Sequence, residues 1–436
     1  TSMDGIVSEE EKKAMMLGFD PEEMAMKAAD FQTLAGVLVQ LETRIDEECR
    51  AAPKPSGGDP SLQHGERVED GQFIYKIFND LNVNVNTYQT FVTMMKCAAK
   101  TVVRGSEIMS QPKQRETPLM EIAKFVERIF KKKQPQFFVT RVGPDTDTFR
   151  SGRKKAGPSL SYWCFFPGLC LQSLTEKGVG SFLLASGTLS PMDSFAHELA
   201  LDFPVRLENP HVIQSNQVWG GVVTCGPNGN VQLNSSFRLR DTPEYKSEIG
   251  NVVLSAAKII PDGLLVFFPS YSVMNSCIQH WKATGIWAGL DAVKTCVVEP
   301  SNSEEFHACY KEFNVALQQV TKRGAAFFAV CRGKVSEGID FADKACRGVI
   351  LTGIPYAGSK DPLVHQKRLY LDKRKQKYGD GYSGNEWYSQ TAMRAVNQAL
   401  GRVIRNRYDF GAVILADERF ANENARNQIS LWLRPS

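Results

Sequence analysis

From about residue 159 onward, short apolar runs alternate with stretches of helical periodicity, and this alternation constrains the fold more than any other feature of the chain. The runs are rich in aromatic or β-branched residues, which favours buried strands. Strands that alternate with helices predict an α/β layer with a mostly parallel sheet. The predicted strands are Leu160–Phe166, Ser181–Ala185, Gly263–Phe268, Thr295–Val298, Ala325–Cys331, Gly348–Thr352 and Gly411–Leu415, with helical stretches at Tyr271–Trp281, Glu304–Val320 and Asp361–Tyr378. Ligands of such sheets bind beyond the carboxyl ends of the strands, so we expect the chemistry at that edge.

The chain before about residue 134 is polar and mostly helical in its periodicity. Phe31–Ile45 places its apolar residues at helical spacing, and a Pro- and Gly-rich loop follows at residues 51–60. Further helical stretches are predicted near Gly71–Leu81, Thr87–Val103 and Pro118–Phe130. This part of the chain holds no recognisable nucleophile–base pair or ligand cluster, so it predicts a mainly helical domain without chemistry of its own.

Composition excludes several classes of protein. The 436 residues carry 52 Lys and Arg against 48 Asp and Glu, a net charge of +4, which is far from a histone-like polycation or an acidic tail protein. A nucleic-acid partner would therefore need a local basic track. No apolar run is long enough to predict a transmembrane helix, and no secretory signal is visible. The ten Cys form no C-x-x-C pair and lie mostly in apolar runs, which predicts free thiols in a reducing compartment and no metal site.

Two of the predicted strands end in polar turns. In Leu183–Pro191, hydroxyl groups and backbone amides would face a ligand at the strand end; the alternative is a strand–turn–helix in which Ser190 or Asp193 caps the helix. After Gly263–Phe268, Ser270 and Tyr271 would touch a ligand or a phosphate backbone; the alternative is a helix cap with a packed tyrosine.

The turn after Ala325–Cys331 is more specific, because it gathers two Gly, two cations and two carboxylates within ten residues. Arg332 and Lys334 would face phosphates, and Glu337 or Asp340 would accept from a ribose or hold an arginine. Backbone amides near Gly333 and Gly338, with the Ser336 hydroxyl, would donate to phosphate oxygens. The alternative is a solvated turn with weak local ion pairs.

The stretch from residue 387 to residue 407 has helical periodicity, and we expect one continuous helix. Arg394, Gln398, Arg402 and Arg405 then step along one face as an anion grip suited to phosphoryl oxygens. Gly401 would lie inside that helix at a cost of about 1 kcal/mol relative to Ala. The alternative is a solvated cationic face.

Two further features of the sequence bear on nucleic acids and nucleotides. The stretch Lys360–Tyr378 is strongly basic with interleaved tyrosines, which is as typical of a nucleic-acid track as of a solvated basic helix.

No G-x-x-x-x-G-K-[ST] and no D-E-A-[DH] sequence occurs in these 436 residues. The chain thus has an arginine grip but no evident cradle for a β-phosphate and no magnesium carboxylate pair.

Four of these segments, in this order, resemble motifs III to VI of the iron–sulfur DNA helicases of superfamily 2, the group typified by the xeroderma pigmentosum group D helicase. The matching segments are Ser186–Pro191, Val266–Tyr271, Val330–Phe341 and Gln398–Arg405. Within the group the chain looks most like the branch of regulators of telomere elongation, on Leu160–Phe165, Leu207–Ile213, Gly353–Tyr356 and Glu386–Tyr388. Motifs I and II and the four cluster cysteines of the family are not found in the sequence, so it resembles only the carboxyl-side portion of the helicase core.

The resemblance implies a RecA-like second motor domain with a parallel sheet, preceded by a mainly helical Arch-like domain. Residues 1–150 would be the Arch-like domain, 159–208 the return segment of the first motor domain with motif III, and 210–436 the second motor domain with motifs IV to VI. The implied activity is ATP-dependent 5′-to-3′ translocation on single-stranded or branched DNA, in telomere maintenance and DNA repair in the nucleus. No membrane association is expected, and the protein partners are unknown apart from the missing first motor domain.

The resemblance also implies roles for single residues. Arg402 and Arg405 would reach the γ-phosphate, and Gln398 would order that contact. Residues near the nucleotide would be Thr188, Glu337, Gly338, Asp340 and Gly401, and residues on the DNA strand would be Ser270, Tyr271, Arg332 and Lys334. ATP with Mg²⁺ would bind at a site completed by the absent portion, and a 4Fe–4S cluster is expected in the complete protein but not in this chain. The chain alone would not hydrolyse ATP; the alternative is a non-catalytic DNA- or protein-binding module derived from a helicase.

Overall fold

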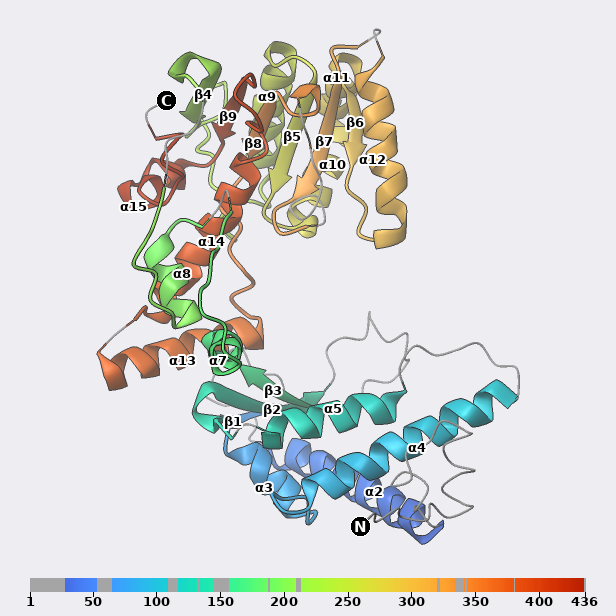
Figure 1. The fold of residues 1–436 in the computed structure, drawn as a ribbon. Coiled ribbons are helices and arrows are strands. Elements are labelled where there is room, and N and C mark those ends of the chain that lie inside the picture. Colours follow the sequence, from blue (N-terminus) through green and yellow to red (C-terminus); the bar gives the residue numbers. More distant parts are fainter. Residues whose placement is uncertain are drawn as a thin grey trace, which may run out of the picture. The chain divides into compact units, whose positions relative to one another are not determined.

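The computed structural model describes residues 28–52, 65–108, 117–131, 133–144, 157–186, 189–208, 213–319, 322–333, 341, 343–379 and 381–434. The chain divides into two compact units, Thr1–Phe166 and Pro167–Ser436, each of which is described by itself. Figure 1 labels their helices and strands along the chain. No helix in the described ranges is both long and apolar enough to cross a membrane.

The first unit combines helices with a small antiparallel sheet of order β1-β2-β3. The apolar faces of its helices pack into one core with Val142, Leu160 and Tyr162 of the sheet. Its elements are α2 (Ala28–Ala51), β1 (Arg67–Asp70), α3 (Phe73–Asn79), α4 (Tyr88–Ile108), α5 (Pro118–Lys131), the 3₁₀ turn η2 (Pro135–Phe137), β2 (Phe138–Pro144) and β3 (Pro158–Cys164). The four predicted helical stretches are confirmed, whereas the prediction that Leu160–Phe166 belongs to the parallel sheet is wrong. That segment lies in β3, which pairs antiparallel with β2 and ends two residues before the division of the units.

The second unit is an α/β structure around a six-stranded sheet. Its helices are α7 (Gly168–Glu176), α8 (Met192–Leu199), α9 (Pro243–Ile259), α10 (Tyr271–Thr284), α11 (Ile286–Val293), α12 (Ser303–Leu317), α13 (Pro362–Tyr378), α14 (Gly384–Leu400) and α15 (Glu423–Arg426). Its strands are β4 (Val218–Val222), β5 (Gly263–Phe268), β6 (Thr295–Val298), β7 (Ala325–Val330), β8 (Gly348–Leu351) and β9 (Gly411–Leu415), with 3₁₀ turns η3 (Ser215–Gln217), η5 (Asp343–Ala345) and η6 (Glu418–Ala421).

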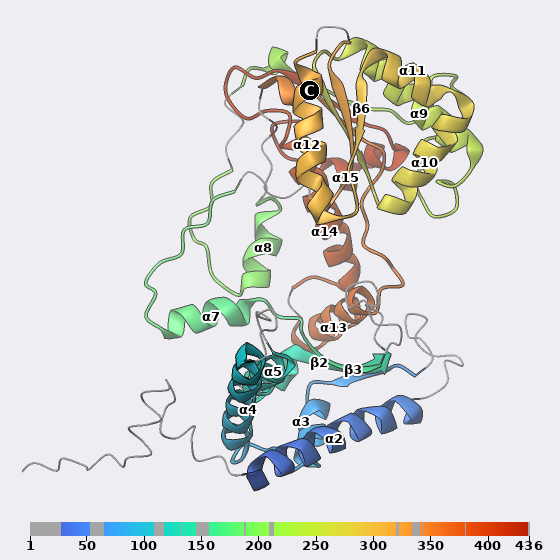
Figure 2. The same cartoon turned by 90° about the vertical axis from the view of Figure 1, so that its right-hand side faces the viewer.

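All strand pairs of this sheet are parallel, in the order β4-β9-β8-β5-β7-β6. Alternate residues of each central strand enter two separate cores: Leu265 and Phe267 of β5 face one, and Leu264, Val266 and Phe268 face the other. The first core contains residues of α12 and α14, and the second contains residues of α9, α10 and α11. Figure 2 shows α9, α10 and α11 on one face of the sheet and α12 on the other. The predicted α/β fold with a mostly parallel sheet is therefore confirmed, and helices cover both faces of the sheet.

Two differences from the predicted strands have a physical cause. Ser181–Ala185 is extended but forms no strand, because no described segment pairs with it and the Leu183 side chain is 89% exposed. The edge strand β4 was not predicted, because its sequence Val-Trp-Gly-Gly-Val contains two glycines and a Trp219 side chain that stays exposed.

Candidate functional site

The helix that carries the predicted arginine grip ends earlier than the side-chain periodicity indicates. Helix α14 ends at Leu400, and Gly401 is its C-cap instead of an internal residue. The amides of Arg402 and Val403 bond to carbonyls three residues back, which marks a tighter turn after the helix. The prediction of one continuous helix through Arg405 is therefore wrong. Val403 and Ile404 keep their apolar spacing because the turn buries both in the core.

The loop after this turn is held by Asp409, whose carboxylate is buried. Asp409 Oδ2 accepts from the backbone amides of Arg405 at 2.8 Å and Asn406 at 3.0 Å, and Oδ1 lies 3.1 Å from Arg347 Nη1. Burial alone would raise the pKa of Asp409, but these hydrogen bonds and the Arg347 guanidinium outweigh it and lower the pKa below its usual value. The conformation that presents Arg405 to solvent is therefore fixed by a charged buried pair.

Positive charge gathers at this edge. The guanidiniums of Arg405, Arg347 and Arg402 all act on the buried thiol of Cys346, the residue before Arg347. Burial raises the pKa of the Cys346 thiol to about 12, although the three positive charges pull it down. Arg402 itself is 7% exposed. Three guanidiniums around one thiol, one of them paired with Asp409, leave an excess of positive charge that suits an anionic phosphoryl group.

This cluster lies at the amino edge of the sheet, opposite to the edge we expected. Arg347 directly precedes β8, and Asp409 lies two residues before β9. Because α14 connects back to the start of a parallel strand, its carboxyl end returns to the amino ends of the strands. The rule that ligands bind beyond strand carboxyl ends therefore does not locate Gln398, Arg402 and Arg405.

Arg394 does not belong to this cluster. Its guanidinium pairs with Glu198 of α8 at 2.9 Å, donates to the Ser194 hydroxyl at 2.6 Å and lies over the Phe195 ring at 5.9 Å. The predicted four-residue face of Arg394, Gln398, Arg402 and Arg405 is thus divided, and Arg394 attaches α8 to α14.

The carboxyl edge of the sheet is organised by Glu299, which follows β6 and is 2% exposed. Its Oε2 accepts from Val330 N of β7 at 2.8 Å, and its Oε1 accepts from the Tyr271 hydroxyl at 3.0 Å. Burial and the neighbouring Glu299 charge raise the pKa of Tyr271 well above its usual value. Ser270 caps α10 through Val273 N at 3.4 Å, as in the alternative reading of the sequence. The two predicted DNA residues therefore have structural partners already, whereas Arg332 is exposed at the end of β7 with a φ of 64°.

A second buried carboxylate stands at the same edge. Asp417, fully buried after β9, accepts from the amide and hydroxyl of Ser235 and from the Arg419 guanidinium at 2.7 Å. Beside it the rings of Tyr356 and Tyr388 stack at 5.1 Å, with Arg419 lying 6.0 Å from the Tyr356 ring. The sequence analysis did not find Glu299, Asp409 or Asp417. Glu299 and Asp417 directly follow predicted strands or lie one residue beyond them, which is the signal that would have found them.

Several predicted residues cannot be placed. Thr188, Lys334, Glu337, Gly338 and Asp340 lie outside the described residues, so their proposed contacts with nucleotide or DNA stay predictions. What is described of this turn ends at Gly333, where an added Cβ would lie 2.7 Å from Glu299 Oε1.

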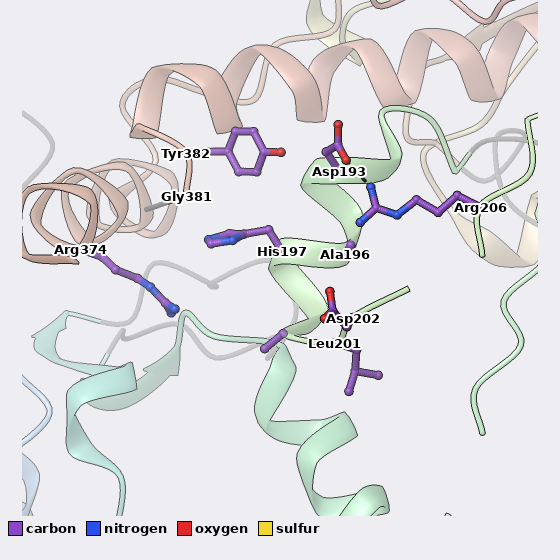
Figure 3. Close-up of a pocket in the computed structure, with 10 residues that line it drawn as sticks. Asp193, Ala196, His197, Leu201, Asp202, Arg206, Arg374, Gly381 and Tyr382 are labelled. Carbon is purple, nitrogen blue, oxygen red and sulfur yellow. Dashed lines mark hydrogen bonds and ion pairs between the residues drawn. The ribbon is translucent and has the colours of Figure 1, made fainter. Parts of the chain in front are cut away.

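A pocket of about 720 Å³ opens between α8 and the turn that joins α13 to α14. In Figure 3, Arg374 from α13 and His197 from α8 point into the same space, and Asp193 pairs with Arg206 at its rim. Gly381 lies against the His197 ring, with a φ of 83° that favours glycine. With Asp202, the lining holds two carboxylates and two guanidiniums, so the pocket by itself does not select an anion.

The cysteines do not assemble a cluster site. All ten are free thiols, and within the described ranges no three His, Cys, Asp or Glu side chains gather in a way that would hold a metal ion. These described cysteines do not fit a 4Fe–4S cluster.

Comparison with known proteins relates two parts of the sequence to helicase domains. Residues 253–436 match the Helicase C-terminal domain family, and residues 2–167 match the RTEL1 helicase ARCH domain family. The "Regulator of telomere elongation helicase 1 homolog" of Arabidopsis thaliana is 42% identical, over 95% of this chain and 40% of the relative. The chain carries an RTEL1 helicase ARCH domain and a Helicase C-terminal domain. The "Regulator of telomere elongation helicase 1" of Mus musculus is 35% identical over 94% of this chain and 35% of its own length.

The chain thus spans about two fifths of the length of the curated RTEL1 relatives it matches. A solved chain titled XPD helicase shares 15% identity with a TM-score of 0.46, covering 91% of this chain and 62% of that chain.

Proposed function

We propose that this chain is the Arch and second motor portion of an ATP-dependent DNA helicase that moves 5′ to 3′ along single-stranded DNA. The proposed setting is telomere maintenance and DNA repair in the nucleus, on single-stranded or branched DNA. The RTEL1 relatives support this assignment through their names as regulators of telomere elongation. The proposed domains keep the boundaries 1–150, 159–208 and 210–436.

The observation that carries the proposal is the cationic cluster at the amino edge of the second-unit sheet. Arg405 is exposed on a loop whose two amides are held by Asp409, and Arg402 and Arg347 lie around the same buried thiol. A rigidly presented arginine at a domain edge is the device by which a second domain stabilises charge on a transferring phosphoryl group. Arg402 and Arg405 would act on the γ-phosphate of ATP, and Gln398, one turn earlier on α14, would order that contact.

ATP with Mg²⁺ would supply the phosphoryl group, held by a first motor domain that completes the site. Gly401, Thr188, Glu337, Gly338 and Asp340 are proposed to lie near the nucleotide. We propose that the first motor domain docks on an apolar pocket of about 290 Å³ that is lined by Leu183, Val205 and Leu207, which are 75% to 89% exposed. An exposed apolar patch of this kind marks an interaction surface.

DNA would run along the carboxyl edge. Arg332 is exposed there, and Ser270 and Tyr271 shape the turn beside it. Lys334 is proposed as a further phosphate contact. Because Tyr271 and Ser270 have structural partners, we expect them to position the edge, while Arg332 and Lys334 supply the charge for the phosphate backbone.

The test compares a substitution at each edge of the sheet, in a complete helicase that contains this chain, by measuring ATP hydrolysis and DNA affinity. Arg405→Ala should remove ATP hydrolysis and leave the affinity for single-stranded DNA within about threefold, because its charge faces the phosphoryl group. Arg332→Ala should weaken DNA binding and lower the salt dependence of that binding by about one phosphate contact. If Arg405→Ala retained full ATP turnover, the assignment of the amino edge would be wrong.

A second candidate is a non-catalytic DNA- or protein-binding module derived from a helicase. The lack of G-x-x-x-x-G-K-[ST] in these 436 residues favours it, because no segment of them would cradle a β-phosphate. Binding of DNA without ATP turnover by the protein as the cell makes it would support this candidate. ATP turnover that is stimulated by DNA would exclude it.

A further inference from the structure

Helix α13 is basic along its whole length, but its two halves use their charges differently. Six of its 17 residues are Lys or Arg, and Asp372 is its one acidic residue. In the first half, Arg368 lies 4.9 Å from the Tyr388 ring, and Lys367, 8% exposed, lies 5.9 Å from the Trp387 ring. These cations pack α13 against α14, so they are part of the fold.

The contact between the two helices is close and precedes the second half of α13. Asp372 accepts from Gly384 N at 2.8 Å, and a Cβ at Gly384 would lie 2.5 Å from Arg368 O. Figure 1 shows α13 lying across the start of α14. The first half is therefore fixed, and it orients the rest of the helix.

The second half of α13 carries two exposed lysines, Lys373 and Lys377, without ion-pair partners in the described residues. Lys375 pairs with Glu386 at 2.9 Å, and Arg374 points into the pocket of Figure 3. Tyr378 is 60% exposed, with the Lys377 ammonium 5.2 Å from its ring. Within two turns the surface thus offers two exposed ammonium groups and an accessible aromatic ring.

We infer that the second half of α13, residues 373–378, binds the backbone of a single DNA strand, with a base stacked on Tyr378. This contact rests on the proposed function as a DNA helicase and adds a binding surface apart from the carboxyl edge of the sheet. Exposed lysines on a helix that is fixed at its other half would contact phosphates without reading sequence. An exposed tyrosine beside them would stack on a base of any kind.

The test measures the affinity of the full 436-residue chain for a fluorescent oligo-dT as a function of salt concentration. Lys373→Ala with Lys377→Ala should weaken binding roughly 10- to 30-fold at about 0.1 M salt, and lower the salt slope by about 1.4, the value for two phosphates on a single strand. Tyr378→Ala should weaken binding at least about fivefold, whereas Tyr378→Phe should keep the parental affinity.

The matched control is Lys258→Ala with Lys311→Ala, which removes the same charge from exposed lysines of α9 and α12. The inference requires the control to stay within about twofold of the parent in affinity, and Lys373→Arg with Lys377→Arg to bind like the parent. Equal losses in the α13 and control variants would overturn it, because the effect would then come from net charge. Failure of the parent chain to bind oligo-dT at all would instead contradict the DNA-binding part of the proposed function.

Discussion

The two edges of the second-unit sheet differ in how their charges are used. At the carboxyl edge, Glu299 and Asp417 are buried and their oxygens join strand ends to neighbouring turns. At the amino edge, Asp409 holds a loop whose arginine side chain remains exposed. The buried carboxylates of the carboxyl edge make contacts within the fold. The buried carboxylate of the amino edge holds a loop so that its arginine side chain faces solvent. The comparison teaches that the arginine proposed to act on a phosphoryl group is distinguished by the buried carboxylate that holds its backbone amide, as well as by its spacing in the sequence.

The amino edge contains a second buried charge with a structural use. Lys294, before β6, is fully buried, and its ammonium donates to Asp262 O at 2.7 Å and Arg323 O at 2.8 Å. These carbonyls belong to the loops before β5 and β7. One lysine thus joins the amino ends of three neighbouring strands.

The largest expected effect on stability is at Asp409. Asp409→Ala should lower the free energy of local opening of β8 and β9 by about 3 kcal/mol or more. The substitution leaves the Arg347 guanidinium buried without its carboxylate partner. Native-state hydrogen exchange of the β8 and β9 amides measures this free energy. Glu304→Ala, at an exposed site on α12, serves as the control and should change it little. A loss below about 1 kcal/mol for Asp409→Ala would mean that the loop is held by other contacts.

The lowered pKa of Asp409 also predicts that the stability it contributes is lost at acid pH. The folded-state pKa of Asp409 is lowered, so its contribution is complete above the unfolded-state pKa and is lost as the pH falls through the folded-state value. The difference in β8 and β9 opening free energy between the parent and Asp409→Asn should therefore shrink as the pH falls from about 5 toward 3. A difference that is independent of pH would contradict the charged form of Asp409 in the folded chain.

A smaller effect is expected at Lys294, where stability also rises with pH, but in the alkaline range. Burial lowers the pKa of Lys294 to about 8, below the unfolded-state value, so the unfolded chain binds more protons between these two values. The parent should gain about 2 kcal/mol of stability from pH 7 to 9.5 relative to Lys294→Met. Urea unfolding of both proteins at each pH gives the difference. If the stability of the parent and of Lys294→Met changed equally with pH, the pKa of Lys294 would not be lowered in the folded chain.

The smallest expected effect is at the carboxyl edge. Tyr271→Phe removes one hydrogen bond to Glu299 and should cost about 1 kcal/mol of stability. A double-mutant cycle with Glu299→Gln should give a coupling of about 1 kcal/mol. Additive losses would show that the tyrosine hydroxyl and the carboxylate do not act together, and the carboxyl edge would then be less tightly organised than its distances indicate.

Much of the sheet was predictable because its strands are buried on both faces. The bounds of β5, β6 and β9 agree with the predicted runs, since continuous apolar stretches of this length have few alternatives. Strand β1, Arg67–Asp70, carries three charged residues among four and gives no such signal. It exists because β2 supplies its hydrogen bonds from a segment about 70 residues away.

The candidate site was predictable in composition but not in geometry. The spacing of Gln398, Arg402 and Arg405 predicts that they share one face of a helix. Val403 and Ile404 strengthen this prediction, because they continue the apolar pattern past the end of α14. The loop that presents Arg405 is held by Asp409, whose other partner, Arg347, lies 62 residues earlier in the sequence. A contact of that sequence separation leaves no local pattern, so the placement at the amino edge could only come from the structure.

The most direct test of the arginine assignment is DNA-stimulated ATP hydrolysis by a complete helicase carrying Arg402→Ala and Arg405→Ala. Loss of a charge that stabilises the transferring phosphoryl group predicts a fall in turnover of about a thousandfold or more. The affinity for single-stranded DNA should stay within about threefold of the parent, because the proposed DNA contacts lie at the carboxyl edge and on α13. Turnover within tenfold of the parent, or a parallel loss of DNA binding, would contradict the division of the two edges into a nucleotide side and a DNA side.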